Sequence, residues 1–75
     1  MEKSFYGGDG CEVCRIVEKN NGRQYLICDD NDVAMREVGY DEFCKFLDKF
    51  ENVTAHSWNK KWREKYLEMR RFLYE

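Results

Sequence analysis

The 75-residue chain contains no proline, a single histidine and no apolar run near the ~20 residues that a membrane-spanning helix requires. Without proline, the breaks between elements depend on glycine and asparagine. Without a long apolar run, a transmembrane helix is excluded, and residues 1–5 lack the basic and apolar regions of a secretory signal. We therefore expect a cytoplasmic protein that makes no membrane contact.

The short length limits the kinds of function that this chain can carry. A domain of this size buries only about 60% of the surface that its unfolded chain exposes, so we expect one domain over residues 1–75 and no enclosed active-site cleft. The hydrophobic fraction of 43% nevertheless exceeds what a disordered chain carries. Together these features favour a folded binding protein over an enzyme, with no cofactor.

Short β-rich runs predict three strands in the first half of the chain. Asn21-Gly22 lies between residues 12–18 and 23–29, and this dipeptide is a strong signal for a two-residue hairpin turn. Turn-favouring residues then separate a third strand at residues 33–38. We expect one face of the sheet to be the core side. It carries five apolar or thiol side chains: Val17, Leu26, Cys28, Val33 and Met35, with Val17 paired to Leu26.

Two helices are predicted after Gly39, because the apolar spacing changes there to that of a helix. The first has Asp41 as its N-cap, ends near Phe50 and carries the stripe Phe43, Phe46, Leu47 and Phe50. The second, over residues 57–74, carries the stripe Trp58, Trp62, Tyr66, Met69 and Leu73. The predicted fold is α+β: a small three-stranded antiparallel sheet of two hairpins, followed by two helices packed on one face.

The cysteines raise the question of a metal site. Cys11 and Cys14 have the Cys-x-x-Cys spacing at which two thiolates bind one tetrahedral ion, and Cys28 with either Cys44 or His56 would complete the site. We favour structural thiols and no metal, because the chain has no second such pair and free cysteine is among the most buried residue types. The alternative is a zinc-stabilised nucleic-acid-binding or transcription accessory module that uses these thiols and a basic C-terminal helix.

Charge is unevenly distributed along a chain whose net charge is −2. Residues 1–55 contain seven Lys or Arg and twelve Asp or Glu, whereas residues 56–75 contain six and three. The excess of acidic residues over residues 1–55 predicts a protein partner with a basic surface, because complementary charge speeds association. Four aspartates in turns are the expected contact residues: Asp9, Asp29, Asp30 and Asp32.

The basic C-terminal helix has a less specific interpretation. We expect its aromatic residues to be core and its cations to be a solvated flank, with Lys60 and Lys61 paired to Glu64 and Lys65 paired to Glu68. Direct nucleic-acid binding is the secondary expectation, because an acidic domain repels phosphate at long range.

A resemblance to a known family is carried by the segment Tyr6-Gly7-Gly8-Asp9-Gly10-Cys11-Glu12-Val13-Cys14, followed later by Ile27-Cys28 and an acidic run. The segment resembles the N-terminal part of a small phage-encoded anti-CRISPR family that inhibits type II-C Cas9. The resemblance implies an α+β fold and binding over the catalytic site of the nuclease's HNH domain, with Asp9 contacting the catalytic centre. It implies a phage-type inhibitor, acting in the cytoplasm of a bacterial host, that occludes a nucleic-acid-processing enzyme such as a CRISPR nuclease.

Overall fold

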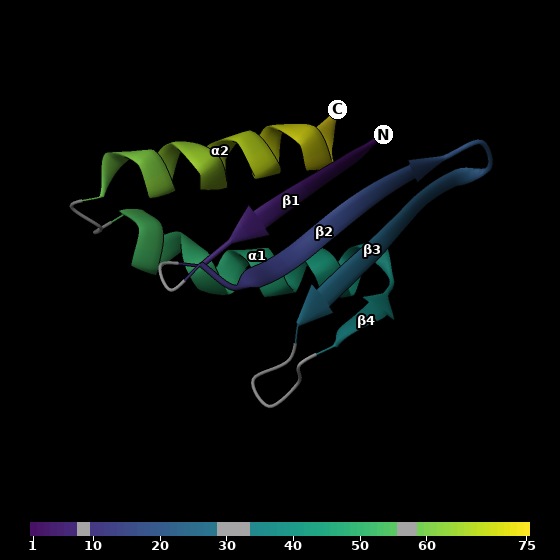
Figure 1. Cartoon of the computed structure of the whole chain (residues 1–75), viewed down its shortest axis with the longest axis horizontal. Helices are drawn as coiled ribbons and strands as arrows, with labels where there is room; N and C mark the ends of the chain where they lie inside the picture. The colour runs from purple at the N-terminus through teal and green to yellow at the C-terminus, as the bar shows by residue number, and fades with distance from the viewer. Residues whose placement is uncertain (8–9, 29–33, 56–58) are drawn as a thin grey trace.

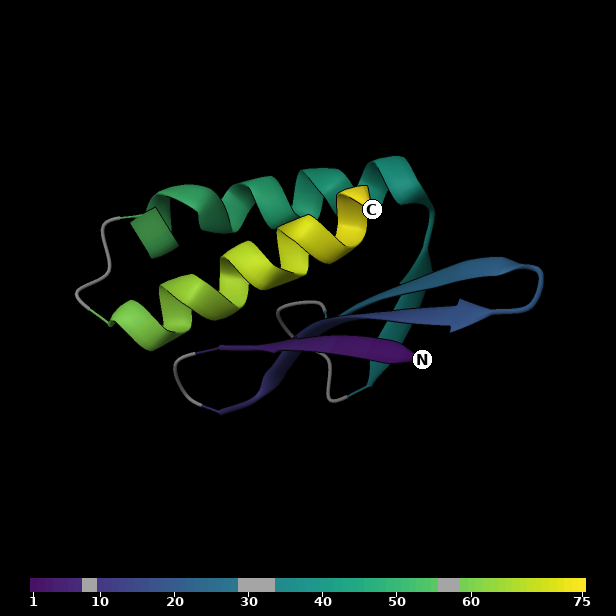
Figure 2. The same cartoon turned by 90° about the horizontal axis from the view of Figure 1, so that it is seen from above.

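The computed structural model describes residues 1–7, 10–28, 34–55 and 59–75. The elements follow one another as β1 (Glu2–Tyr6), β2 (Glu12–Lys19), β3 (Gly22–Cys28), β4 (Met35–Val38), α1 (Tyr40–Ala55) and α2 (Lys60–Tyr74). The strands form one antiparallel sheet in the order β1-β2-β3-β4, and both helices lie against the same face of it (Figure 1, Figure 2). The predicted α+β class is confirmed, but the sheet has four strands rather than three.

The strand that sequence reasoning missed is β1. It pairs with β2, with Glu2 opposite Val17 and Phe5 opposite Cys14. Phe5 is its one fully buried side chain, so β1 lacks the repeated apolar alternation that predicts a half-buried strand. Pairing with β2, rather than its own pattern, makes this segment a strand.

The β2–β3 hairpin turns one residue earlier than predicted. Lys19 pairs with Gly22, so the turn consists of Asn20 and Asn21. Gly22 has a φ of 132°, in the region that only glycine adopts readily. The shift moves the partner of each β2 residue by two positions along β3. Because side chains alternate with a period of two, the residues that were predicted to share a face still share one.

The core side of the sheet is the opposite of the predicted one. The helices cover the face that carries Phe5, Cys14, Ile16, Ile27 and Val38. Val17, Leu26, Cys28 and Met35 lie half-buried on the other face, and Val33 lies outside the described residues. Both faces of the strands carry apolar side chains, so alternation alone did not identify the face on which the helices pack.

Helix α1 differs from its prediction at both ends. The amide of Phe43 donates to the carbonyl of Gly39 at 3.0 Å, so Asp41 lies in the first turn and is not the N-cap. Its negative charge there still suits the positive end of the helix dipole. The helix continues past Phe50 to Ala55, since neither proline nor glycine interrupts residues 51–55.

Helix α2 begins at Lys60, with Asn59 as the N-cap that accepts a hydrogen bond from the Trp62 amide at 3.1 Å. The predicted start at residue 57 and Trp58 lie outside the described residues. The predicted stripes of both helices do form the core, with these side chains fully buried: Phe43, Leu47, Tyr66, Met69 and Leu73. Within the described part of the chain, neither helix is long and apolar enough to cross a bilayer.

Polar contacts fix the helix layer in place. The Tyr66 hydroxyl donates to the Leu47 carbonyl at 2.8 Å and so joins α2 to α1. The Arg23 guanidinium, at the far end of the hairpin, donates to the carbonyls of Phe72 and Leu73 at 2.9 and 3.1 Å. These carbonyls belong to the last turn of α2, whose acceptors have no partner within the helix. Arg23 therefore caps α2 from the sheet.

Candidate functional site

The acidic segments are attached at one end of the sheet. Outside the described residues lie the four aspartates expected to contact a partner: Asp9, Asp29, Asp30 and Asp32. The residues before them are placed: Tyr6 ends β1 and Cys28 ends β3. Both strands are antiparallel to β2, so they run in the same direction and end at the same end of the sheet (Figure 1). Strands two apart in a sheet are about 10 Å from each other, so the two segments leave from neighbouring points.

The open face is the side of the sheet away from both described helices (Figure 2). Its centre consists of the half-buried residues Val17, Leu26, Cys28 and Met35. Cys28 pairs with Met35, and Leu26 lies between Arg15 on β2 and Glu37 on β4. An apolar centre beside charged neighbours is the composition of a protein-binding patch.

Several polar residues of the open face are hydrogen-bonded to one another. Arg15 Nε donates to Glu12 Oε2 at 2.8 Å, and this hydrogen bond, against the effect of burial, holds the pKa of Glu12 below its usual value. On the other side of the apolar centre, Gln24 Nε2 donates to Glu37 Oε1 at 3.1 Å. A partner that covers this face therefore gains chiefly from the apolar centre, since the polar rim already has its hydrogen bonds.

The cysteines occupy separate environments. Cys14 is fully buried in the core, and burial raises the pKa of its thiol to about 12, which disfavours the thiolate that zinc requires. Cys28 lies on the open face instead. The other ligands considered for zinc are spread further: Cys11 is exposed, Cys44 is half-buried on α1, and His56 lies outside the described residues. Among the residues that the structure describes, no three Cys, His, Asp or Glu are placed to hold a metal ion.

The cations of α2 are less paired than predicted. Lys65 Nζ lies 3.9 Å from Glu68 Oε2, but Lys3 holds the same carboxylate more closely, at 3.1 Å. Glu64 forms no ion pair with a lysine of the described chain, contrary to its predicted pairing with Lys60 and Lys61. The helix surface therefore keeps positive charge that the described residues do not neutralise.

Two of these cations line the β1-edge groove, a hollow of about 320 Å³ where α2 passes the edge strand β1. Lys61 and Lys65 contribute its charge, and Trp62 contributes to its wall. Trp62 Nε1 donates to the Tyr6 carbonyl at 2.9 Å, which joins α2 to the end of β1. Tyr6 also lines the groove and is 53% exposed. Sequence reasoning missed Tyr6, because only the folded chain brings residue 6 beside residues 61 and 65.

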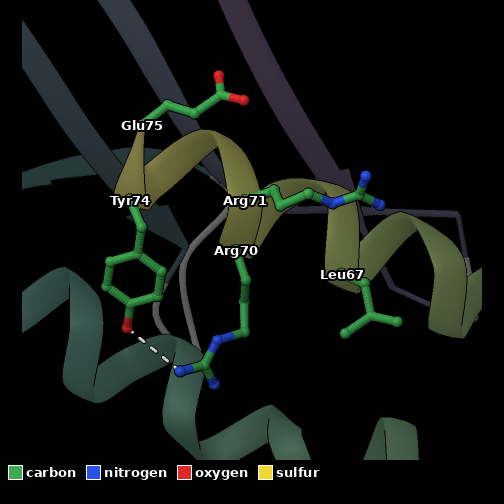
Figure 3. Close-up of a pocket in the computed structure, with 5 residues that line it drawn as sticks. All are labelled: Leu67, Arg70, Arg71, Tyr74 and Glu75. Carbon is green, nitrogen blue, oxygen red and sulfur yellow. Dashed lines mark hydrogen bonds between the residues drawn. The ribbon is translucent and has the colours of Figure 1, made fainter.

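A second groove, of about 520 Å³, runs along the C-terminal part of α2 (Figure 3). Leu67 and Tyr74 line it and are 50% and 57% exposed. Arg70 is engaged by the Tyr74 hydroxyl at 3.2 Å and by carboxylates of α1. Arg71 and Glu75 bring opposite charges to the same groove, so its charge selects no class of ligand.

Comparison with known proteins adds no assignment to these surfaces. No family model, curated protein or solved structure matches this chain. Within the described part of the chain, the chemistry of the open face and that of the β1-edge groove are each distinct enough to indicate a ligand.

Proposed function

We propose that this chain is a small acidic protein-binding domain that inhibits a nucleic-acid-processing enzyme by occlusion. One observation carries the proposal: both acidic segments are attached at the same end of the sheet that bears the open face. Asp9 follows β1, and the run from Asp29 to Asp32 follows β3. Carboxylates beside an apolar face would have the anatomy of many protein interfaces.

The proposed mechanism requires no chemistry by the chain itself. Aspartate carboxylates would form ion pairs with the basic side chains that otherwise bind the phosphates of a nucleic-acid substrate. Their charge raises the association rate more than the final affinity. The open face adds apolar area, and each Å² removed from water contributes about 25 cal/mol. Substrate and inhibitor then compete for one basic surface.

Type II-C Cas9 is the first enzyme to test, because the segment around Asp9 resembles that of the anti-CRISPR family. On this proposal Asp9 meets the catalytic centre of the HNH domain, while the run from Asp29 to Asp32 contacts basic residues beside it. The open face would cover the neighbouring protein surface. This partner rests on the resemblance, whereas the general proposal of a basic protein partner rests on the placement of the acidic segments.

A DNA-cleavage assay with a panel of type II-C Cas9 nucleases tests the proposal directly. The wild-type chain should inhibit cleavage, and Asp9→Ala and the combined Asp30→Asn/Asp32→Asn change should each weaken inhibition by about tenfold or more, since a charge pair buried at an interface is costly to break. Thermal midpoints should stay unchanged, because the sequence predicts surface positions for these aspartates, where substitutions cost within about ±0.5 kcal/mol. Higher salt should reduce the difference between wild type and variants.

Glu75→Gln is the matched control for these variants. It removes one carboxylate from an exposed position after α2, beside the turn that Arg23 caps, and this is the hairpin end of the sheet, opposite the acidic end. Inhibition by this control should equal that of the wild type. If the control loses as much inhibition as Asp9→Ala, the partner senses only net charge, and the assigned surface is wrong. A wild-type chain that neither binds nor inhibits any nuclease of the panel would remove Cas9 as the partner.

A further inference from the structure

We propose that the β1-edge groove binds one nucleotide unit of single-stranded nucleic acid, with its phosphate between Lys61 and Lys65 and its base against Tyr6. This site goes beyond the proposed inhibition, because it lies at the junction of β1 and α2 and takes a different class of ligand. Nothing in the open face or the acidic segments requires it.

The first line of support is local charge. Among the described residues that line the groove, the charged ones are Lys61 and Lys65, and none is a carboxylate. They lie at i and i+4 on α2, so they project from the same side of the helix. Lys61 forms no ion pair within the described chain, and Lys65 has only the 3.9 Å contact to a carboxylate that Lys3 holds at 3.1 Å. Two ammonium groups that the described residues neutralise only through this long contact favour a bound anion.

The second line of support is an exposed ring beside these cations. Tyr6 is 53% exposed, whereas the neighbouring Phe5 is buried and stacked against Trp62, with 6.2 Å between ring centroids. The hydrogen bond from Trp62 Nε1 to the Tyr6 carbonyl holds the Tyr6 backbone against α2. The exposed ring is therefore attached to a fixed point beside the lysines. Every nucleobase has a π-face that stacks on such a ring.

Size and surroundings favour a strand over a free phosphate or a phosphopeptide. The volume of about 320 Å³ exceeds what a lone phosphate needs and is at the lower end of small-ligand sites. Strand β1 is at the edge of the sheet, and among the described strands it pairs only with β2, so none of them closes the groove and a nucleic-acid backbone can continue past it. A free phosphate or a phosphoserine would leave the Tyr6 ring unused. The net charge of −2 keeps the expected binding weak and dependent on salt.

Fluorescence anisotropy with labelled decathymidylate tests the site on the whole chain. At about 50 mM salt we expect a dissociation constant of about 10–100 μM, the range of non-specific nucleic-acid binding. Two phosphate contacts predict a log–log salt slope of about −1.4. The Lys61→Ala/Lys65→Ala variant should weaken binding about tenfold or more and bring the slope near zero. Tyr6→Ala should weaken it about tenfold, while Tyr6→Phe should bind like the wild type.

The matched control is Lys45→Ala/Lys49→Ala, which removes two exposed lysines from α1, and its affinity should equal that of the wild type. Equal losses from the two lysine pairs would overturn the site in favour of diffuse attraction. Loss of binding in Tyr6→Phe, or none in Tyr6→Ala, would overturn the stacking. Displacement of the strand by equimolar inorganic phosphate or phosphoserine peptide would show a phosphate site alone. The lysine variants should still inhibit cleavage, so this site and the proposed function fail separately.

Discussion

The two faces of the sheet contain similar side chains in different surroundings. Ile16 and Ile27 on the covered face are 0% and 2% exposed beneath α1 and α2. Val17 and Leu26, their neighbours in sequence, are only half-buried, because both described helices lie on the other face. Apolar content therefore does not distinguish the covered face from the open face in this chain. The helix layer makes the distinction, and it leaves the open face available to a partner.

The largest effect should come from comparing adjacent residues on opposite faces. Ile16→Ala leaves a cavity beneath the helices and should lower the free energy of unfolding by about 2–5 kcal/mol. Val17→Ala removes a half-buried side chain and should cost about 1 kcal/mol or less. Urea unfolding followed by tryptophan fluorescence measures both. Equal costs would mean that the two faces are equally buried and would remove the open face as a surface.

A smaller effect is expected where the sheet holds the helix layer. Arg23→Ala removes charged hydrogen bonds to the last carbonyls of α2 and the contact of the guanidinium with the Phe72 ring, 4.8 Å from its centroid. We expect a loss of about 1.5–3 kcal/mol in the free energy of unfolding. Hydrogen exchange should show that the loss is accompanied by faster opening of the last turn of α2. Unchanged exchange there would show that Arg23 does not cap the helix.

Alkaline pH should lower the free energy of unfolding through Cys14, which lies on the covered face. Burial raises the pKa of this thiol from its ordinary value near 9 to about 12. The folded chain therefore retains a proton that the unfolded chain loses, so this stabilising contribution is complete below pH 9 and is lost as pH rises towards 12. Burial also raises the pKa of the Tyr66 hydroxyl, which acts in the same direction.

Comparing wild type with Cys14→Ala isolates the thiol. Between pH 9 and 12 the wild-type chain should lose up to about 1.4 kcal/mol more per pH unit than the variant, as measured by urea unfolding at each pH. Parallel pH dependences would show that the Cys14 thiol is ionised as readily in the folded chain as in the unfolded one, contrary to its place in the core.

The smallest effect concerns the rim of the open face. Glu12 and Arg15 are partly exposed, so a double-mutant cycle of Glu12→Gln and Arg15→Ala should give a coupling of about 1 kcal/mol or less. A coupling of several kcal/mol would show that the ion pair is an internal structural element of the fold. The open face would then resemble the covered face in its energetics.

Sequence patterns predicted the parts of the fold in which local periodicity and final burial agree. Two apolar stripes, one that begins at Phe43 and one that ends at Leu73, identified the two helices. The dipeptide Asn21-Gly22 identified the hairpin, one residue from its actual turn. The patterns failed where long-range contacts decide. Phe5 becomes a core residue of β1 only by pairing opposite Cys14, and the choice of covered face depends on how the helices fold back.

The candidate site likewise has parts that the sequence predicts and parts that only the fold shows. The acidic segments are evident from composition, but their aspartates lie outside the described residues, so their expected contact with a partner stays a prediction. Tyr6 is 55 positions from Lys61 in the sequence, and only the fold, through the hydrogen bond from the Trp62 indole to the Tyr6 carbonyl, brings the two residues together. The Cys-x-x-Cys spacing suggested a metal, but spacing alone does not show that the strand turns Cys14 into the core.

The most direct test of the central claim is a methyl NMR titration of the labelled chain with the HNH domain of an inhibited type II-C Cas9. If the open face binds the partner, the methyl signals of Val17, Leu26 and Met35 should shift or broaden, while those of Ile16 and Ile27 should change little. Val17 and Ile16 are adjacent in β2, so this comparison distinguishes the two faces within one strand. Changes confined to Leu67 on α2, or equal changes on both faces, would contradict the claim.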